Sequence, residues 1–235
     1  MDIAGNIARV EERVLNACLR SGRKREEITV MGVTKTLPAA AVLEAWRGGL
    51  RCFGESRVRE AADKFAALRE GQGRDAEMAG MELHLIGSLQ RNKAKLAVSV
   101  FDCVQSVDRE SLIEELAKHS AERNSPLPVL LEYRTGEDTK SGFTGMDELF
   151  RAAEMVCACP SLRLCGLMTI APNAADIGPV RAAFRCLAKA RDELECAFPG
   201  RAECLSMGMS GDYETAIEEG STLLRIGSAI FGDRT

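Results

Sequence analysis

Two cations stand at the ends of strand-like segments that are about 190 residues apart (225 − 35) in the sequence. Lys35 follows the apolar, β-branched run of residues 28–34, and Arg225 closes a second such run that begins at Thr222. Parallel αβ barrels carry their chemistry at the C-terminal ends of the strands, so these two residues would meet across one mouth. A lysine in a desolvated mouth, beside another cation, is shifted toward the neutral amine that attacks a carbonyl.

A segment rich in glycine and serine, residues 206–211, precedes an expected helix near the C-terminus. Free N–H groups at such a helix start favour an anion, and barrels often bind phosphate after the seventh and eighth strands. Residues 206–211 and 225–228 fall at those two places. Taken alone, Ser210 is more typical of a helix cap and Gly227 of a turn. Together, and opposite Lys35, the two segments predict a site for a phosphorylated aldehyde.

The elements that would position these residues alternate along the chain between strand-like and helical patterns. About eight strands are expected, at 28–34, 50–53, 82–86, 100–105, 127–132, 162–168, 202–206 and 222–226. Helices are expected at 38–47, 56–70, 90–97, 109–122, 146–158, 177–197 and 211–219. This order predicts an α/β fold, a single (β/α)8 TIM-type barrel with an extra N-terminal helix over residues 3–20, in one domain spanning residues 1–235. A doubly wound open sheet is the competing fold.

Composition excludes several classes of function. The chain has 235 residues with 31 basic and 35 acidic side chains, a net charge of −4, which offers no electrostatic basis for binding nucleic acid or an anionic membrane. No signal-like N-terminus or apolar stretch of about 18 residues is present, so a cytoplasmic protein is expected. The nine cysteines lie mostly in apolar runs without Cys-x-x-Cys spacing, and there are two histidines, so no metal site is predicted.

Other catalytic motifs fit poorly. Residues 208–211 have a serine between glycines, but the nucleophile elbow Gly-x-Ser-x-Gly fails because position 212 is Asp. A phosphate-binding loop of the Gly-x-x-x-x-Gly-Lys-Ser/Thr type is absent from the sequence. A barrel hydrolase or aldolase is therefore a distant possibility.

Seven ordered segments resemble the pyridoxal phosphate homeostasis protein family, from about residue 30 to the C-terminus. These segments are Val33–Thr36, Phe53–Glu55, His84–Lys93, Lys140–Gly142, Gly166–Met168, Leu205–Ser210 and Arg225–Gly232. The resemblance implies a barrel like the N-terminal domain of alanine racemase and a role in vitamin B6 homeostasis. It also implies that pyridoxal 5′-phosphate (PLP) is bound as a Schiff base on Lys35, with Arg225 facing the pyridine nitrogen.

The same resemblance implies the remaining cofactor-binding residues. Ser210, with the backbone around Gly227 and Ser228, would bind the phosphate. Met207 and His84 lie inside matching segments and are further candidates for contact with the cofactor.

The chain departs from the family's usual pattern near the lysine. Ser56 stands where asparagine usually follows Gly-Glu, Thr34 stands where serine often precedes the lysine, and Leu37 replaces a common second lysine. The loop of residues 136–145, with Lys140, is a candidate lid over the site.

Arg225 also bears on whether the protein is an enzyme. An arginine at the ring nitrogen disfavours ring protonation and so weakens the stabilisation of a carbanion. In the racemases the opposite-face acid or base comes from a second domain and subunit, for which 235 residues leave no room. We therefore expect a non-catalytic, monomeric carrier of PLP and of other B6 vitamers, with apo-forms of PLP enzymes as acceptors. A PLP-dependent amino acid racemase is the alternative.

Overall fold

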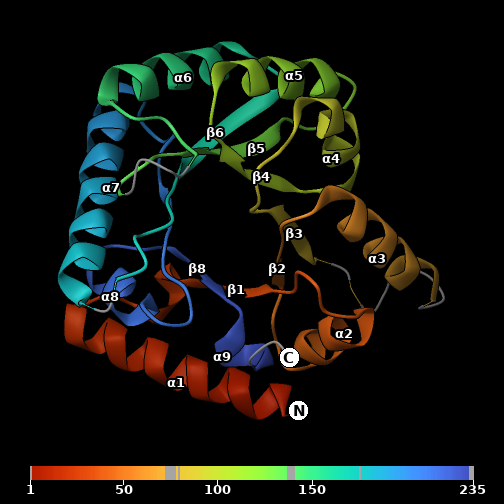
Figure 1. The fold of residues 1–235 in the computed structure, drawn as a ribbon, viewed down its shortest axis with the longest axis vertical. Helices are drawn as coiled ribbons and strands as arrows, with labels where there is room; N and C mark the ends of the chain where they lie inside the picture. Colours follow the sequence, from red (N-terminus) through yellow and green to blue (C-terminus); the bar gives the residue numbers. More distant parts are fainter. Residues whose placement is uncertain (1, 72–77, 79, 137–140, 175, 233–235) are drawn as a thin grey trace.

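The computed structural model describes residues 2–71, 78, 80–136, 141–174 and 176–232. Within these residues eight parallel strands close into a barrel in sequence order, and the last strand pairs with the first (Figure 1). The strands are β1 (Thr29–Val33), β2 (Cys52–Glu55), β3 (Glu82–Leu85), β4 (Cys103–Val107), β5 (Leu127–Glu132), β6 (Leu162–Met168), β7 (Cys204–Ser206) and β8 (Leu223–Ile226). The closed barrel confirms the predicted fold and rules out the open sheet.

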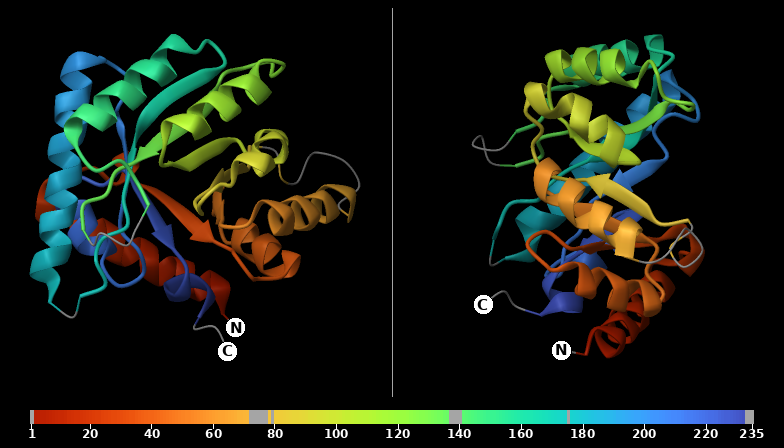
Figure 2. Two further views of the ribbon diagram at one scale, coloured as in Figure 1. Left: turned by 45° about the horizontal axis from the view of Figure 1, so that its top comes forward. Right: turned by 90° about the vertical axis from the view of Figure 1, so that its right-hand side faces the viewer.

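Helices follow the strands and lie around the outside of the barrel (Figures 1 and 2). They are α1 (Ile3–Ser21), α2 (Ala39–Arg47), α3 (Val58–Gly71), α4 (Ala94–Val100), α5 (Glu110–Ser120), α6 (Met146–Ala158), α7 (Ile177–Ala197), α8 (Tyr213–Glu218) and α9 (Ser228–Phe231), with short 3-10 turns at Arg25–Glu27 and Arg91–Lys93. Among the described helices, none has both the length and the apolar character needed to cross a membrane.

Side-chain alternation along each strand produces two separate cores. In β1, Val30 packs outward into the large apolar layer between the barrel and the helices, whereas Met31 points into the barrel, where it meets Cys52 and Leu223. Polar and sulfur-containing side chains fill much of the barrel interior, and the outer layer is almost entirely apolar. The chemistry of the molecule is therefore concentrated on the inward-facing positions.

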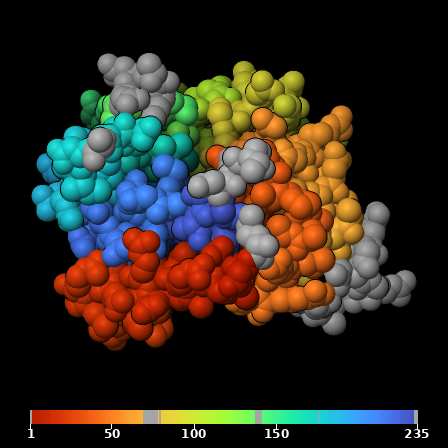
Figure 3. Space-filling view, turned by 60° about the horizontal axis from the view of Figure 1, so that its bottom comes forward, coloured from red at the N-terminus to blue at the C-terminus, as the bar shows by residue number. Residues whose placement is uncertain are grey.

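The predicted N-terminal helix is α1, which is bounded by specific caps. The Asp2 carboxylate accepts the N–H of Gly5 at 2.8 Å, and Gly22 ends the helix with a φ of 68°. Apolar side chains at helical spacing, from Ile3 to Cys18, are buried. They pack against α2, α8 and α9, so α1 crosses one face of the molecule beside the C-terminal elements (Figure 3).

Several element boundaries differ from the sequence prediction by one to four residues, and one helix was not predicted. The fourth strand was expected to begin at residue 100, but α4 continues through Val100 and β4 begins at Cys103. The four-residue helix α9 was not predicted, because one turn is too short to produce a helical periodicity.

Candidate functional site

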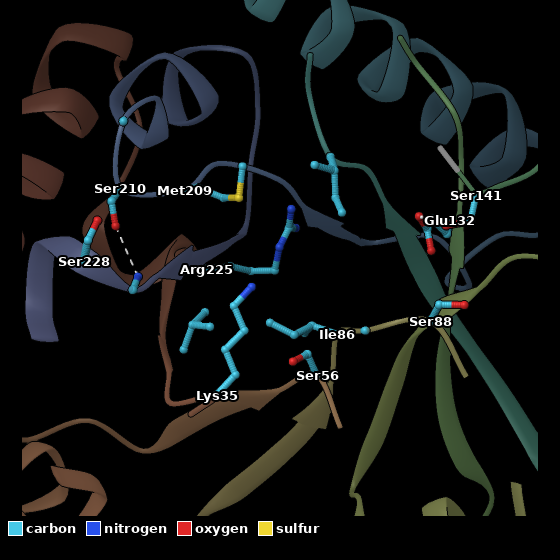
Figure 4. Close-up of a pocket in the computed structure, with 15 residues that line it drawn as sticks. Lys35, Ser56, Ile86, Ser88, Glu132, Ser141, Met209, Ser210, Arg225 and Ser228 are labelled. Carbon is cyan, nitrogen blue, oxygen red and sulfur yellow. Dashed lines mark hydrogen bonds between the residues drawn. The ribbon is translucent and has the colours of Figure 1, made fainter. Parts of the chain in front are cut away.

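A cavity of about 600 Å³ opens at the C-terminal ends of the strands (Figure 4), and we call it the mouth cavity. The ends of seven different strands and the loops that follow them contribute to it, so residues distant in sequence meet there. Its lining comprises Val33, Lys35, Ser56, Ile86, Gly87, Ser88, Glu132, Ser141, Ile170, Met209, Ser210, Gly211, Arg225, Gly227 and Ser228.

Lys35 enters this cavity directly from the end of β1. Val33 and Lys35 line the cavity while Thr34, between them, is buried on the side of α3. The Lys35 side chain is half-buried and extends toward Arg225 (Figure 4). A primary amine is thus presented inside a cavity whose other wall holds a buried cation.

Side chains of α3 hold the backbone around Lys35 in place by hydrogen bonds. Thr36 has a φ of 67°, a left-handed conformation that costs energy for a residue with a branched side chain. Its N–H donates to the Glu60 carboxylate at 2.6 Å, and the Lys64 ammonium donates to the Thr34 carbonyl at 2.9 Å. Both neighbours of Lys35 are therefore bonded to one helix, which limits the positions open to the amine.

A buried ion pair supports this arrangement. The Lys64 ammonium lies 2.8 Å from the Glu55 carboxylate, and their side chains are 8% and 0% exposed. Glu55 also accepts the Thr34 hydroxyl at 2.7 Å. Such a pair is costly to bury and costlier to break, because removal of one partner leaves an uncompensated charge.

Arg225 is the second cation of the mouth cavity, on β8, and it is 5% exposed. Its guanidinium donates to the Ser206 hydroxyl at 2.8 Å and to the Thr169 carbonyl at 2.7 Å. Burial lowers the pKa of Arg225 to about 10, against the opposing effect of the negative charges of Asp212 and Glu132. The guanidinium therefore remains a cation at neutral pH, and its two hydrogen bonds are to neutral acceptors.

A chain of hydrogen bonds runs from Arg225 down through the barrel, and we call it the polar chain. Ser206 donates to the Gln105 carbonyl oxygen at 2.6 Å, and the Gln105 amide nitrogen lies 2.8 Å from Nδ1 of His84. Nε2 of His84 lies 3.4 Å from the Glu82 carboxylate at the N-terminal end of the barrel. The orientation of Arg225 is therefore linked to groups at the opposite end.

The glycine- and serine-rich segments lie together on the other side of the mouth cavity. The Ser210 hydroxyl oxygen accepts the N–H groups of Gly227 and Ala229, at 3.2 and 3.1 Å (Figure 4). Because that oxygen already accepts two bonds, its own proton is available to an anion in the cavity. Gly208 has a φ of 94°, and a Cβ there would lie 2.6 Å from that of Ala216, so the close approach of this loop to α8 requires glycine.

The structure brings five of the seven sequence-predicted residues to the mouth cavity, namely Lys35, Ser210, Arg225, Gly227 and Ser228. It places Met207 and His84 elsewhere. Met207 faces outward into the layer between barrel and helices, because it alternates with the inward-facing Ser206. His84 faces inward but two residues below Ile86, so it lines a second cavity near the N-terminal end of the barrel. Neither residue lines the mouth cavity, and their contact with the cofactor stays a prediction.

Sequence reasoning missed a carboxylate in the mouth cavity. Glu132 is buried at the end of β5 and accepts the Ser141 hydroxyl at 2.8 Å. Burial raises the pKa of Glu132, while Ser141 and the charge of Arg225 oppose that shift. The sequence did contain a signal for Glu132, because it is a single carboxylate at the end of the apolar run 127–132. The predicted lid residue Lys140 lies outside the described residues.

Comparison with known proteins agrees with this geometry. The sequence profile of the alanine racemase N-terminal domain family matches residues 10–235. The pyridoxal phosphate homeostasis protein of Vibrio cholerae is 40% identical over 233 residues, covering 99% of this chain and 96% of that protein.

Solved structures extend the comparison. The structure of PipY from Synechococcus elongatus with PLP bound has a TM-score of 0.80 at 33% identity, over 95% of this chain and all of PipY (100%). Alanine racemase from E. faecalis has a TM-score of 0.67 at 19% identity, over 96% of this chain and 58% of the racemase. The racemase likeness concerns the barrel fold alone.

Proposed function

Because this chain belongs to the pyridoxal phosphate homeostasis protein family, we propose that its mouth cavity binds pyridoxal 5′-phosphate and that Lys35 is the residue of covalent attachment. The chain binds this cofactor and acts in its homeostasis, as its full-length relatives do. The observation that carries the proposal is the meeting of Lys35, Arg225 and Ser210, from three strand ends, around one cavity of about 600 Å³.

The lining of the mouth cavity fits the groups of the cofactor. The volume lies in the range of ordinary small-molecule sites, about 300–1,000 Å³. A phosphate next to Ser210 would accept the free proton of its hydroxyl and meet the small residues Gly211 and Ser228. The aldehyde of the cofactor supplies the carbonyl with which an amine condenses reversibly to a Schiff base. The Lys35 amine lies on the opposite wall.

Arg225 favours binding over catalysis. A buried guanidinium next to the ring nitrogen would keep that nitrogen unprotonated, and its Nη atoms donate to Ser206 and Thr169 rather than to a carboxylate. An unprotonated ring is a weaker electron sink. We therefore propose a carrier without efficient catalysis, acting as a single-domain monomer. Isotope exchange at Cα of alanine in deuterated water tests this: turnover of about 1 s⁻¹ or more would favour the racemase alternative.

The attachment residue is tested with a matched pair of lysine variants. Lys35→Ala should lose the absorption band of the lysine-bound cofactor, whereas Lys189→Ala should keep it, because Lys189 is 82% exposed on α7. A band that survives in Lys35→Ala would contradict the assignment of Lys35.

Release of the cofactor is tested by transfer. The loaded protein, mixed with an apo-form of a PLP enzyme, should restore that enzyme's activity. If transfer persists with a trap for free aldehyde, delivery is direct; if the trap abolishes it, the protein releases cofactor to solution. Absence of transfer in both conditions would contradict the carrier function and leave a storage role.

A further inference from the structure

The N-terminal end of the barrel contains a second cavity, of about 410 Å³, which we call the base cavity. Thiols, an imidazole and carboxylates line it, among them Cys103, Cys165, Cys204, His84, Glu82 and Asp102. Cys52 lies beside it on β2, close enough that Glu82 and Cys204 act on its thiol electrostatically. All four of these cysteines are free thiols. The proposed function uses none of these residues.

We propose that Cys52, Glu82 and His84 form a binding site for a divalent transition metal ion of the zinc type. One ligand atom from each residue, the Cys52 sulfur, a Glu82 carboxylate oxygen and a His84 ring nitrogen, lies within 4.8 Å of the other two. In the described part of the chain, these three residues are the group whose potential ligand atoms all lie within 4.8 Å of one another.

The measured separation matches tetrahedral coordination. Metal–ligand distances of about 2.0–2.1 Å to nitrogen and oxygen place two tetrahedral ligand atoms about 3.3–3.4 Å apart. Nε2 of His84 and Oε2 of Glu82 are 3.4 Å apart. These two atoms therefore need no movement to share an ion, and the sulfur, within 4.8 Å of both, must move to a separation of about 3.5 Å if it is now farther away.

The strand register produces this group. In the pairing of β2 with β3, Cys52 is opposite Glu82, and Gly54 is opposite His84. Cys52, Glu82 and His84 all occupy inward-facing positions, so parallel pairing brings a thiol next to a carboxylate and an imidazole. Gly54 leaves space above Cys52, where a side chain would meet Met31.

The ligand types select the class of metal. Thiolate and imidazole ligands suit Zn²⁺ and its neighbours in the first transition row, and are poor ligands for Mg²⁺ and Ca²⁺. Three protein ligands leave a fourth tetrahedral position for water, facing the base cavity. The Glu82 side chain is 65% exposed, so the ion would approach from solvent on that side.

Protons balance in a simple way. Coordination replaces the proton of the Cys52 thiol, which leaves to solvent. His84 would bind through Nε2 with its ring proton on Nδ1. The Gln105 amide, 2.8 Å away, must then turn its carbonyl oxygen to the ring and its nitrogen to Ser206, the reverse of its orientation in the polar chain. One proton is therefore released for each ion bound.

The experiment adds Co²⁺, a coloured substitute for Zn²⁺, to the protein with and without bound PLP. The wild type should bind one equivalent with a thiolate-to-cobalt absorption band, and Zn²⁺ should displace it. Cys52→Ala should lose that band, and Glu82→Gln should weaken binding at least about tenfold. Because Glu82 is exposed, its variant should fold even if the Cys52 variant does not.

Controls separate this site from other thiols and from the mouth cavity. Cys186→Ala removes an exposed thiol on α7 and should bind Co²⁺ like the wild type, as should Lys35→Ala. Absence of the band in the wild type, or a band unchanged in both Cys52→Ala and Glu82→Gln, would overturn the proposal. Failure of the proposed function would leave these results unaltered.

Discussion

The two ends of the barrel are built from the same strands but contain opposite chemistries. At the C-terminal end, Lys35, Arg225 and the serines provide cations and hydroxyl groups. At the N-terminal end, the strands present thiols, a histidine and carboxylates. A shift of two or four residues along a strand exchanges one set for the other, as β3 illustrates with Glu82, His84 and Ile86. Whether a side chain lines the mouth cavity or the base cavity therefore depends on which face of the strand it occupies and how far along the strand it lies, more than on its residue type.

The ends also differ in how the backbone is fixed. Lys35 lies in a strained turn bonded to α3, whereas the potential metal ligands lie within regular strands β2 and β3. The polar chain through Gln105 and Ser206 joins the two ends. The variants below disturb the mouth cavity or this connection, whereas those of the Co²⁺ experiment disturb the other end.

The largest effect on stability is expected behind the mouth cavity. Lys64→Met removes the partner of the buried Glu55 carboxylate and should cost about 3–5 kcal/mol in the free energy of unfolding. It should also weaken cofactor binding, because Lys64 is bonded to the backbone carbonyl before Lys35. Urea denaturation measures the loss, with the exposed Lys189→Met as control. A loss below about 1 kcal/mol, the range of surface pairs, would contradict the structural role of this ion pair.

The next effect concerns the side of the mouth cavity where we propose that the phosphate binds. Ser210→Ala removes one hydrogen bond to a charged group and should reduce PLP affinity by about 1.5–3 kcal/mol. The affinity for pyridoxal, which has no phosphate, should stay nearly constant. Ser88→Ala, in the same cavity but after β3, is the matched control in equilibrium titrations. Equal losses of affinity for PLP and for pyridoxal would show that Ser210 does not bind the phosphate.

Breaking the connection between the ends should have a smaller effect. Gln105→Leu preserves volume but removes the hydrogen-bond partner of Nδ1 of His84 and the acceptor of the Ser206 hydroxyl proton, at a cost of about 1–3 kcal/mol in stability. Thermal or urea unfolding measures it against Gln90→Leu, an exposed position. Wild-type stability in Gln105→Leu would show that the two ends are independent.

The smallest effect is a pH dependence at the mouth cavity. Burial raises the pKa of Glu132, so the folded protein binds this proton more tightly than the unfolded chain does. Its contribution to stability is present below the unfolded pKa and is lost as pH rises through the folded pKa. Glu132→Gln should therefore gain stability relative to the wild type as pH rises from about 4 to 7.

Unfolding at several pH values checks this prediction for Glu132. Exposed Glu203→Gln controls for the general loss of one negative charge. A gain for Glu132→Gln that is constant across the pH range would contradict it.

The sequence predicted the barrel and most of the mouth cavity because both depend on local patterns. Apolar runs ending in Lys35 and Arg225 identify strand ends, and glycine with serine at 206–211 identifies a turn before a helix. Met207 and His84 do not line the mouth cavity, because a motif gives proximity in sequence but not the direction in which each side chain points. Met207 follows the inward-facing Ser206 by one residue and therefore points out of the barrel. His84 precedes Ile86 by two residues and therefore lies nearer the N-terminal end of the barrel.

The base cavity was beyond the reach of sequence patterns. Cys52 and Glu82 are 30 residues apart (82 − 52) and meet only through the register of β2 with β3. Metal-site spacing rules describe ligands on one local segment, so they gave no signal here. The left-handed turn at Thr36 and the buried Glu55 with Lys64 likewise depend on how α3 packs against the strands.

The most direct test of the central claim is borohydride reduction of the PLP-loaded protein followed by peptide mass mapping. Reduction fixes the cofactor to whichever amine it occupies. The geometry predicts the added mass of reduced cofactor on Lys35 alone, with no labelled peptide in Lys35→Ala. Label on Lys64, Lys95 or another lysine of the wild type, with Lys35 unmodified, would contradict the assignment of the mouth cavity as the cofactor site.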